Sequence, residues 1–295
     1  MLLIALLLFC AAALIRWREA VHLLERPGLL AVSIAAVWVG PALFVALLGL
    51  TMPQMFWQAS TSGVMVGLAL VAAMPVANSS VGWTQTAGGN TAFGLALVVL
   101  SILVSPVATP QVLRLMGFAL SAESTESISR VVTDFSGSRF IMWVILPSVA
   151  GMAAATLAGP ELVARARPWL RATTVCTILL LNYANASLAM PQLVADETFA
   201  TLVLPVTLAV LISVVGLGTA SAVSRLAKLP QETRTALLFG QSMKHTGLAL
   251  VLAGELLSGQ PRVLLVIMLA TLTQHLVAGG VTRLLPTGAS EPEGA

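Results

Sequence analysis

Nine apolar stretches separated by short polar connections dominate the sequence and restrict it to one class of fold. The stretches run approximately over Met1–Ile15, Gly28–Leu50, Ser62–Val81, Thr91–Leu113, Phe140–Leu157, Ala172–Met190, Phe199–Thr219, Ala236–Ala253 and Val263–Val281. A helix of about 20 apolar residues crosses the hydrocarbon core of a bilayer. Helices are expected because an open sheet edge in lipid leaves backbone groups unpaired, and the alternating pattern of a barrel is absent. The sequence therefore predicts an all-α polytopic membrane protein with about nine transmembrane helices.

The composition leaves no room for a separate soluble domain. Only 9% of the residues are charged and 58% are hydrophobic, whereas about a quarter of an ordinary soluble domain is charged. The net charge of +3 gives no indication of a nucleic-acid partner. No phosphate-binding loop, zinc-binding helix or nucleophile elbow occurs, and Cys10 and Cys176 lie far apart in apolar runs. We therefore expect no enzyme, no bound metal and no cofactor.

The chain ends carry less information than its middle. Residues 1–286 are expected to form one transmembrane domain, and 287–295 a disordered tail. The first stretch is interpreted as a retained span, because its first basic residues, Arg16 and Arg18, follow the apolar run instead of preceding it. The abrupt start leaves two alternatives: a further upstream helix was lost, or it never existed. The polar connection Met116–Ser138 is expected to be a surface helix or loop.

The basic residues predict the orientation of the chain in the membrane. If residues 16–26 are cytoplasmic, ten of the fifteen Lys and Arg residues fall on that side: Arg16, Arg18, Arg26, Arg165, Arg167, Arg171, Arg225, Lys228, Arg234 and Arg283. Positive charge gathers on the cytoplasmic side of membrane proteins. We therefore expect an integral plasma (inner) membrane protein with its N-terminus outside and its C-terminus in the cytoplasm.

The first polar interruption of the apolar pattern is MPVANSSVGWTQTAGGN, residues 74–90. Pro75 has no N–H and should break the helix at membrane depth. Polar side chains follow that could satisfy the freed backbone groups or face an ion or substrate: Asn78, Ser79, Ser80, Thr84 and Asn90. Broken helices that line a cavity are typical of transporter binding sites. The alternative is a plain proline kink whose Ser and Asn side chains bond back to their own helix.

The second interruption is FGQSMKHTG, residues 239–247. A lysine in mid-membrane costs about 2.5–3.5 kcal/mol on insertion scales, so Lys244 is the strongest functional signal in the chain. A lysine that snorkels to the interface is the alternative. We expect Gly240 and Gly247 to break this helix. Polar groups beside the lysine are further candidates for an ion- or substrate-binding site: Gln241, His245 and Thr246. Gln274 and His275 form a third polar insertion, and the three insertions together favour one shared polar cavity.

PVANSSVGWTQTAGGN and SPVATP, followed later in the chain by QSMKHTGLALVLAG, resemble the bile acid:sodium symporter family. The resemblance runs from about Val21 to Leu285. It implies two inverted repeats, a panel domain beside a core domain, and two discontinuous helices that cross in the core. These helices would contain Asn78–Ser80 and Lys244–Thr246. The resemblance also implies alternating access, with sodium drawing organic anions such as bile acids, steroid sulfates or keto acids inward.

The positions of the family's sodium ligands are mostly replaced in this chain. The resemblance places Gly240 where the family has a Glu and Lys244 where it has a Gln, while Ser80 retains the Ser of a Ser-Asn pair. Other ligand positions lack a side-chain oxygen: Val81, Gly94, Val98 and Ala36. Sodium needs several oxygen donors, and an ammonium nearby opposes cation binding. We hypothesise that Lys244 replaces a sodium ion as a built-in cation.

The sequence therefore favours a secondary active transporter of a small or amphipathic organic anion. Lys244 would stabilise the helix crossing or hold the anion, and it could exchange a proton with His245 or His275. The coupling ion is sodium or a proton, because shifted groups such as Asn78, Ser79 and Gln241 could rebuild a sodium site. Two alternatives stay open: an arsenite-type oxyanion exporter of the same superfamily, and a membrane sensor or scaffold that does not transport. The substrate, the direction of transport and the oligomeric state are not predicted.

Overall fold

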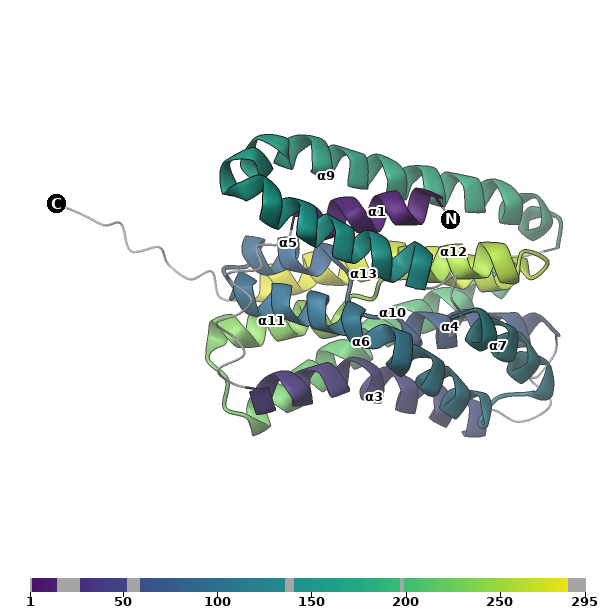
Figure 1. Ribbon diagram of the computed structural model, residues 1–295. Helices are drawn as coiled ribbons and strands as arrows, with labels where there is room; N and C mark the ends of the chain where they lie inside the picture. Colours follow the sequence, from purple (N-terminus) through teal and green to yellow (C-terminus); the bar gives the residue numbers. More distant parts are fainter. Residues whose placement is uncertain (1, 15–26, 52–58, 136–140, 197–198, 286–295) are drawn as a thin grey trace.

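The computed structural model describes residues 2–14, 27–51, 59–135, 141–196 and 199–285, and the described part is helical (Figure 1). The α-helices are α1 (Leu2–Ala13), α3 (Pro27–Thr51), α4 (Ala59–Ala73), α5 (Ser79–Thr86), α6 (Thr91–Gly117), α7 (Ala122–Phe135), α9 (Leu146–Asp196), α10 (Phe199–Leu226), α11 (Gln231–Ser242), α12 (Thr246–Leu256) and α13 (Pro261–Leu284). One π-helix, η3 (Ile141–Ile145), precedes α9. Among these residues the β-type pairing is limited to an isolated bridge between Val76 and Lys244.

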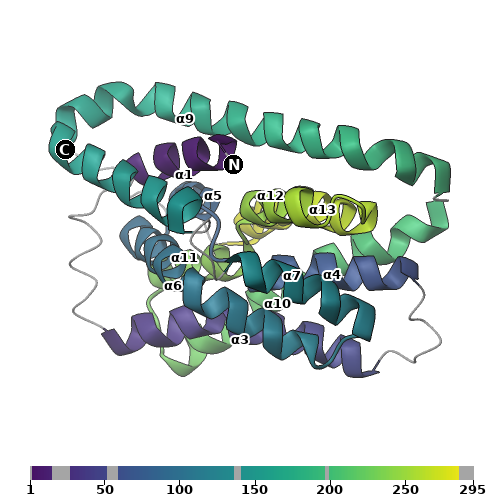
Figure 2. The same cartoon turned by 45° about the vertical axis from the view of Figure 1, so that its right-hand side comes forward.

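The long helices lie roughly side by side, and α1 and α9 pack together as an outer layer along one side of the molecule (Figures 1 and 2). Helix α3 lies on the opposite side. The interrupted pairs α4/α5 and α11/α12 lie between them, flanked by α6, α10 and α13. The breaks of the two interrupted helices are therefore inside the protein.

The breaks within the two interruptions are buried. Residues 62–77, which include most of α4 and the break after it, are all buried, and so are residues 235–246. Irregular backbone at membrane depth is tolerated where protein surrounds it, because lipid cannot satisfy its N–H and C=O groups. The helices around the breaks supply those partners.

Five helical stretches are long and apolar enough to cross a membrane: Pro27–Thr51, Thr91–Gly117, Ile141–Thr177, Leu202–Leu226 and Pro261–Leu284. Two shorter apolar helices, Ser62–Ala73 and Thr246–Leu256, belong to the interrupted pairs. This composition is that of an all-α membrane protein, as the sequence predicts.

Two regions differ in detail from the expected pattern. The stretches expected as separate spans over Phe140–Leu157 and Ala172–Met190 belong to η3 and the 51-residue α9, which turns at Gly159 (φ 78°, ψ 165°). That φ lies in the left-handed region that favours glycine. The Arg-rich segment after the turn stays helical, because Ala, Leu and Arg are good helix formers. The tail 287–295 and most of the connection after α1 lie outside the described residues.

The connection expected as a surface helix or loop contains α7. Its apolar and small residues recur on one face that packs against the core: Ser124, Ser127, Ile128, Val131 and Val132. Two hydrogen bonds tie this face to its neighbours. The hydroxyls of Ser62 and Ser124 lie 2.9 Å apart, and Gln260 Nε2 donates to Ser127 Oγ at 2.9 Å. Helix α7 therefore joins the start of α4 to the start of α13.

Candidate functional site

The two interrupted helices meet at their breaks and pair through their backbones. Ala77 N–H donates to the Met243 carbonyl at 3.0 Å, and His245 N–H donates to the Pro75 carbonyl at 2.9 Å. These bonds form a short antiparallel bridge centred on Val76 and Lys244. Each break thus supplies hydrogen-bond partners that the other has lost, and the crossing of α4/α5 with α11/α12 is a single connected unit.

The two N–H groups that point away from this bridge are each bound by a side chain. Val76 N–H donates to Ser101 Oγ on α6 at 3.1 Å. Lys244 N–H donates to Gln274 Oε1 on α13 at 2.9 Å. In both cases the acceptor comes from the helix that follows the interrupted helix in the chain. In both halves of the crossing, a side chain of the next helix therefore accepts the N–H of the central bridge residue, from Ser101 in one half and from Gln274 in the other.

The carboxyl end of α4 is capped by side chains from α3, α6 and the second break. The Ala73 carbonyl accepts from Trp38 Nε1 and from Thr109 Oγ1, both at 2.8 Å. The next carbonyl, that of Met74, accepts from Lys244 Nζ at 3.4 Å. The partial negative charge of a helix carboxyl end favours a cation there.

Lys244 is buried at the centre of the crossing, with 2% of its surface exposed. Besides Met74, its ammonium donates to the main-chain carbonyl of Val37 in α3. Both described acceptors of the ammonium are therefore neutral carbonyl oxygens, the kind of ligand that also suits a hard cation. The lysine joins α11/α12 to α3 and to the end of α4, and this geometry fits a structural charge at the crossing.

The end of α11 is held against α3 and α10. Gln241 Nε2 donates to the Ser33 carbonyl of α3 at 2.7 Å. Gly216 of α10 lies directly against the backbone of Gln241 and Ser242, where a Cβ would overlap main-chain atoms. Four buried oxygens near the breaks have no protein partner: Ser33 Oγ, Ser80 Oγ, Gln241 Oε1 and Ser242 Oγ. Two of these oxygens, Ser33 Oγ and Gln241 Oε1, belong to the residues that join α3 to α11.

His245 and Thr246 hold the start of α12. His245 Nδ1 accepts from Leu248 N–H at 3.2 Å and so caps the helix. Thr246 Oγ1 accepts from Gln274 Nε2 at 3.3 Å. Gln274 therefore binds both the break and the first residue of α12, and these groups belong to one cluster with Lys244.

The hydrogen bond and the ring contact of His275 are made with Trp83 of α5, and the shared polar cavity stays a prediction. His275 Nδ1 accepts from Trp83 Nε1 at 3.2 Å. The Trp83 ring stacks on Phe239, with ring centroids 6.3 Å apart. One helical position separates His275 from Gln274, and this turns the histidine towards α5 while the glutamine faces the break.

Several other predicted site residues have local structural partners. Thr84 Oγ1 bonds back to the Ser80 carbonyl at 2.8 Å, and Asn90 Oδ1 caps α6 by accepting from Phe93 N–H at 2.9 Å. Ser79 is exposed at the start of α5. These contacts match the simpler alternative for the first interruption, in which polar side chains satisfy their own helices.

The predicted helix breaks at Gly240 and Gly247 are wrong. Gly240 lies within α11 and Gly247 within α12, and the break comprises Met243, Lys244 and His245. Backbone pairing with the first interruption produces the break, so no glycine is needed. Gly240 serves close packing instead, because a Cβ there would lie 2.9 Å from Leu97 Cδ1 of α6. The predicted break at Pro75 is correct, since α4 ends at Ala73.

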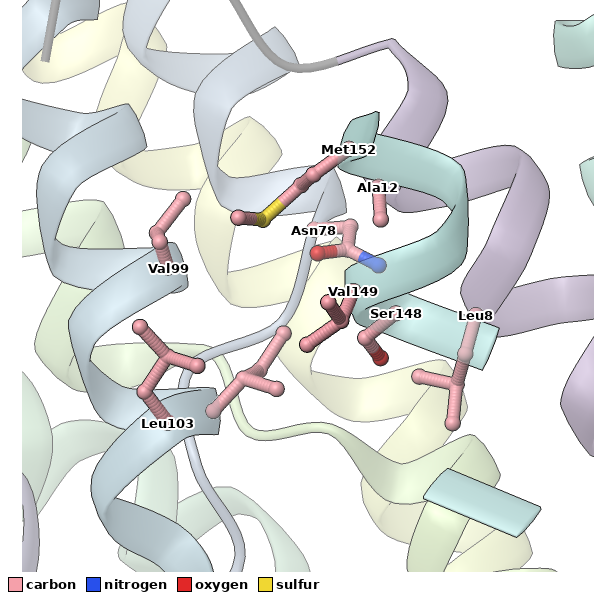
Figure 3. Close-up of a pocket in the computed structure, with 9 residues that line it drawn as sticks. Leu8, Ala12, Asn78, Val99, Leu103, Ser148, Val149 and Met152 are labelled. Carbon is pink, nitrogen blue, oxygen red and sulfur yellow. The ribbon is translucent and has the colours of Figure 1, made fainter. Parts of the chain in front are cut away.

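A small cavity of about 20 Å³ lies beside the first break, between the outer layer and the core (Figure 3). Leu8 and Ala12 of α1 and Met152 of α9 form the wall on the side of the outer layer. Asn78, at the start of α5, and Ser148, at the start of α9, bring polar groups to an otherwise aliphatic lining. Lys244 does not line this cavity. Within the part of the chain that the structure describes, no three His, Cys, Asp or Glu side chains gather as they would around a metal ion.

Sequence reasoning missed the partners that organise the crossing. Trp38, Ser101 and Thr109 are single polar groups in apolar helices, and each binds a backbone atom of the first break. A lone polar residue in an apolar run is a weak signal. The two breaks themselves indicate that such partners must exist, because every buried N–H and C=O group that a break frees needs a hydrogen-bond partner.

A family model described as the SBF-like CPA transporter family matches residues 2–285 of the chain. The match covers both breaks and all the helices that surround them. It confirms the resemblance that the two interrupted segments indicate. Among curated proteins, none matches the chain.

Proposed function

The chain belongs to the SBF-like CPA transporter family, and we propose that it is a secondary active transporter that works by alternating access. The interrupted helices support this function, because discontinuous helices near the bilayer midplane are the usual binding elements of secondary transporters. In the proposed architecture α3 to α6 and α10 to α13 are inverted repeats that form the core domain. The matched roles of Ser101 and Gln274 support this division. Helices α1 and α9 form the panel domain.

The proposed substrate is a small or amphipathic organic anion that binds between panel and core. The cavity there is mainly aliphatic, and from its volume of about 20 Å³ it would widen to admit such an anion when panel and core move apart. Asn78 precedes α5 without capping it, so its carboxamide is available to a ligand. The amino end of a helix also favours negative charge. An aliphatic wall opposite such an end suits an amphipathic anion.

Lys244 acts in this proposal as a built-in cation that replaces a sodium ion. The observation that carries the proposal is its ammonium, buried between the carbonyls of Val37 and Met74. A bound sodium ion would use the same kind of ligand and the same partial charge at the end of α4. Because Lys244 is 2% exposed and lies outside the cavity lining, its proposed role is to stabilise the crossing, not to hold the substrate.

The proposed location is the plasma (inner) membrane. In the proposed orientation, four parts of the chain face the cytoplasm: the amino ends of α3 and α11, the turn of α9 and the carboxyl end of α13. These elements lie at one end of the molecule in Figure 1. Together with the carboxyl end of α10 and the connection to α11, they carry the described basic residues of the cytoplasmic set: Arg165, Arg167, Arg171, Arg225, Lys228, Arg234 and Arg283. The charge asymmetry supports the orientation.

The test of the coupling ion is thermal unfolding of the purified protein in sodium chloride and in choline chloride. A sodium site filled at 100 times its Kd would stabilise the native state by about 2.7 kcal/mol. We expect equal melting temperatures in the two salts. A sodium-specific rise would overturn the built-in cation and restore a sodium-coupled mechanism.

The test of transport is uptake into proteoliposomes of labelled probes: a bile acid, a steroid sulfate and a keto acid. We expect uptake of at least one probe without a sodium gradient, and its loss in Asn78→Ala. Binding of a probe without uptake would instead indicate a sensor, and uptake of arsenite alone would indicate an oxyanion exporter. Thr86→Val is the matched control, because Thr86 is exposed and bonds to the Gly82 carbonyl of its own helix.

A further inference from the structure

The acceptor that holds Lys244 on α3 exists because of a proline. Helix α3 continues through Pro41. In a regular helix the N–H of residue 41 donates to the carbonyl of residue 37. Proline has no N–H, so the Val37 carbonyl loses its helical partner in the interior of the protein. This is the carbonyl that the ammonium of Lys244 binds.

The second acceptor also lies beside a proline. Met74 precedes Pro75, and a residue before proline disfavours the helical conformation. Helix α4 accordingly ends at Ala73, and the Met74 carbonyl faces Lys244 at 3.4 Å. Two prolines, Pro41 inside α3 and Pro75 just after α4, thus bring two free carbonyls to one ammonium.

A contrasting proline in α6 shows that this arrangement is not automatic. Pro106 likewise frees the carbonyl of Ile102, four residues earlier. Ser105 Oγ of the same helix donates to that carbonyl at 2.7 Å. The corresponding residue before Pro41 is Gly40, which has no side chain that could donate to the Val37 carbonyl. Glycine at 40 is required by packing, because a Cβ there would overlap the side chain of Thr219 on α10.

The position of the Val37 carbonyl is fixed by its neighbours. Trp38, the next residue, donates to the Ala73 carbonyl at 2.8 Å and holds α3 against the end of α4. Ser33, one turn earlier, accepts from Gln241 at 2.7 Å. These two hydrogen bonds hold α3 in place, so that the Val37 carbonyl faces the crossing.

We infer that Pro41 is a positioning residue for the Lys244 ammonium, and that the carbonyls of Val37 and Met74 form a cation site which the ammonium fills. The inference rests on the proposed role of Lys244 as a built-in cation and names the residue that creates its ligand. It implies that a small cation enters this site when the lysine side chain is shortened. It also implies that an N–H at position 41 closes the site by satisfying Val37.

The experiment is chemical rescue of Lys244→Ala, measured as melting temperature. The probe is n-propylammonium, which reproduces the atoms that the substitution removes, and n-propanol is the uncharged control. We expect the variant to melt below the native protein and to regain stability with n-propylammonium in a saturable manner, but not with n-propanol. The native protein should respond to neither. An equal response of the variant to both compounds would overturn the inference, because it would show a cavity without a preference for charge.

Pro41 is tested by repeating the titration in a second background. In Pro41→Ala with Lys244→Ala, we expect the loss of stability to be smaller and the specific effect of n-propylammonium to disappear. Pro106→Ala with Lys244→Ala is the matched control and should keep the full response. A response that persists in the Pro41→Ala background would overturn the role of Pro41.

Poor folding of Lys244→Ala still gives an answer. Recovery of folded protein with Pro41→Ala but not with Pro106→Ala supports the inference, and recovery in both or in neither contradicts it. None of these measurements requires transport. Failure of uptake with an intact rescue pattern would therefore reject the proposed function and leave the assignment of Pro41 standing.

Discussion

Replacement of Gln274 by leucine should destabilise the crossing without changing the volume of the core. Gln274 Oε1 is the acceptor for Lys244 N–H at 2.9 Å, and the side chain is 4% exposed. Leucine fills similar space but leaves that buried N–H without an acceptor, which costs about 1–3 kcal/mol. The weaker bond to Thr246 at 3.3 Å is lost as well. We expect a loss of about 2 kcal/mol, and a fall in melting temperature of roughly 3 °C for a chain of this length.

The assay is unfolding of the purified protein in detergent, with two companion variants. Ser101→Ala removes the equivalent acceptor for Val76 N–H, so we expect a loss of similar size. Gln260→Leu removes a half-buried bond to Ser127 Oγ outside the crossing, and its cost should stay below about 1 kcal/mol. Equal melting temperatures for Gln274→Leu and Gln260→Leu would refute the reasoning that the breaks depend on these acceptors.

Three further predictions follow from described contacts, each checked by the same unfolding assay. Trp38→Phe and Thr109→Val should each cost about 0.5–1.5 kcal/mol, because either donor alone still caps the last carbonyl of α4, and the double variant should cost more than the sum; strict additivity would contradict the shared acceptor. Gly216→Ala should cost about 1–3 kcal/mol because its Cβ meets the backbone of α11, whereas Gly218→Ala, with open space around it, should be neutral or stabilising; equal effects would rule out close packing as the cause. Asn90→Ala should cost about 1 kcal/mol because Asn90 caps α6, whereas Asn78→Ala should leave stability nearly unchanged because Asn78 makes no cap bond; the reverse order would count against both assignments.

The sequence predicts the first break at the correct residue and the second break in the correct segment but at the wrong residues. Pro75 ends α4 where the pattern indicates, because a proline removes a hydrogen bond wherever it stands in a helix. Lys244 is at the second break and Gln274 beside it, since a charge in an apolar run is costly enough to imply buried partners. The break at Pro75 and the burial of Lys244 follow from the chemistry of single residues, so they can be predicted from the local sequence.

Features that depend on distant pairing were not predicted. The second break falls at Met243–His245 instead of at a glycine because Pro75 and Ala77 bind there. The role of Pro41 as the source of a free carbonyl requires knowledge that Lys244 lies opposite, 207 positions away from Val37. Such pairs follow from the arrangement of helices in space, and one sequence without its fold does not specify that arrangement.

The pairing of the two breaks has a consequence for biosynthesis. Met74 and its partner Lys244 are 170 residues apart in the chain. At a synthesis rate of about 5–20 residues per second, the first break leaves the ribosome roughly 10–30 s before the second. During that interval the Ala73 carbonyl has Trp38 and, soon after, Thr109 as partners. The carbonyls of Val37, Met74 and Pro75, which later bind the second break, do not yet have those partners. The first half of the protein is therefore expected to stay in a hydrated or chaperoned environment at the insertion machinery until α11 and α12 arrive, and to enter lipid only as a completed crossing.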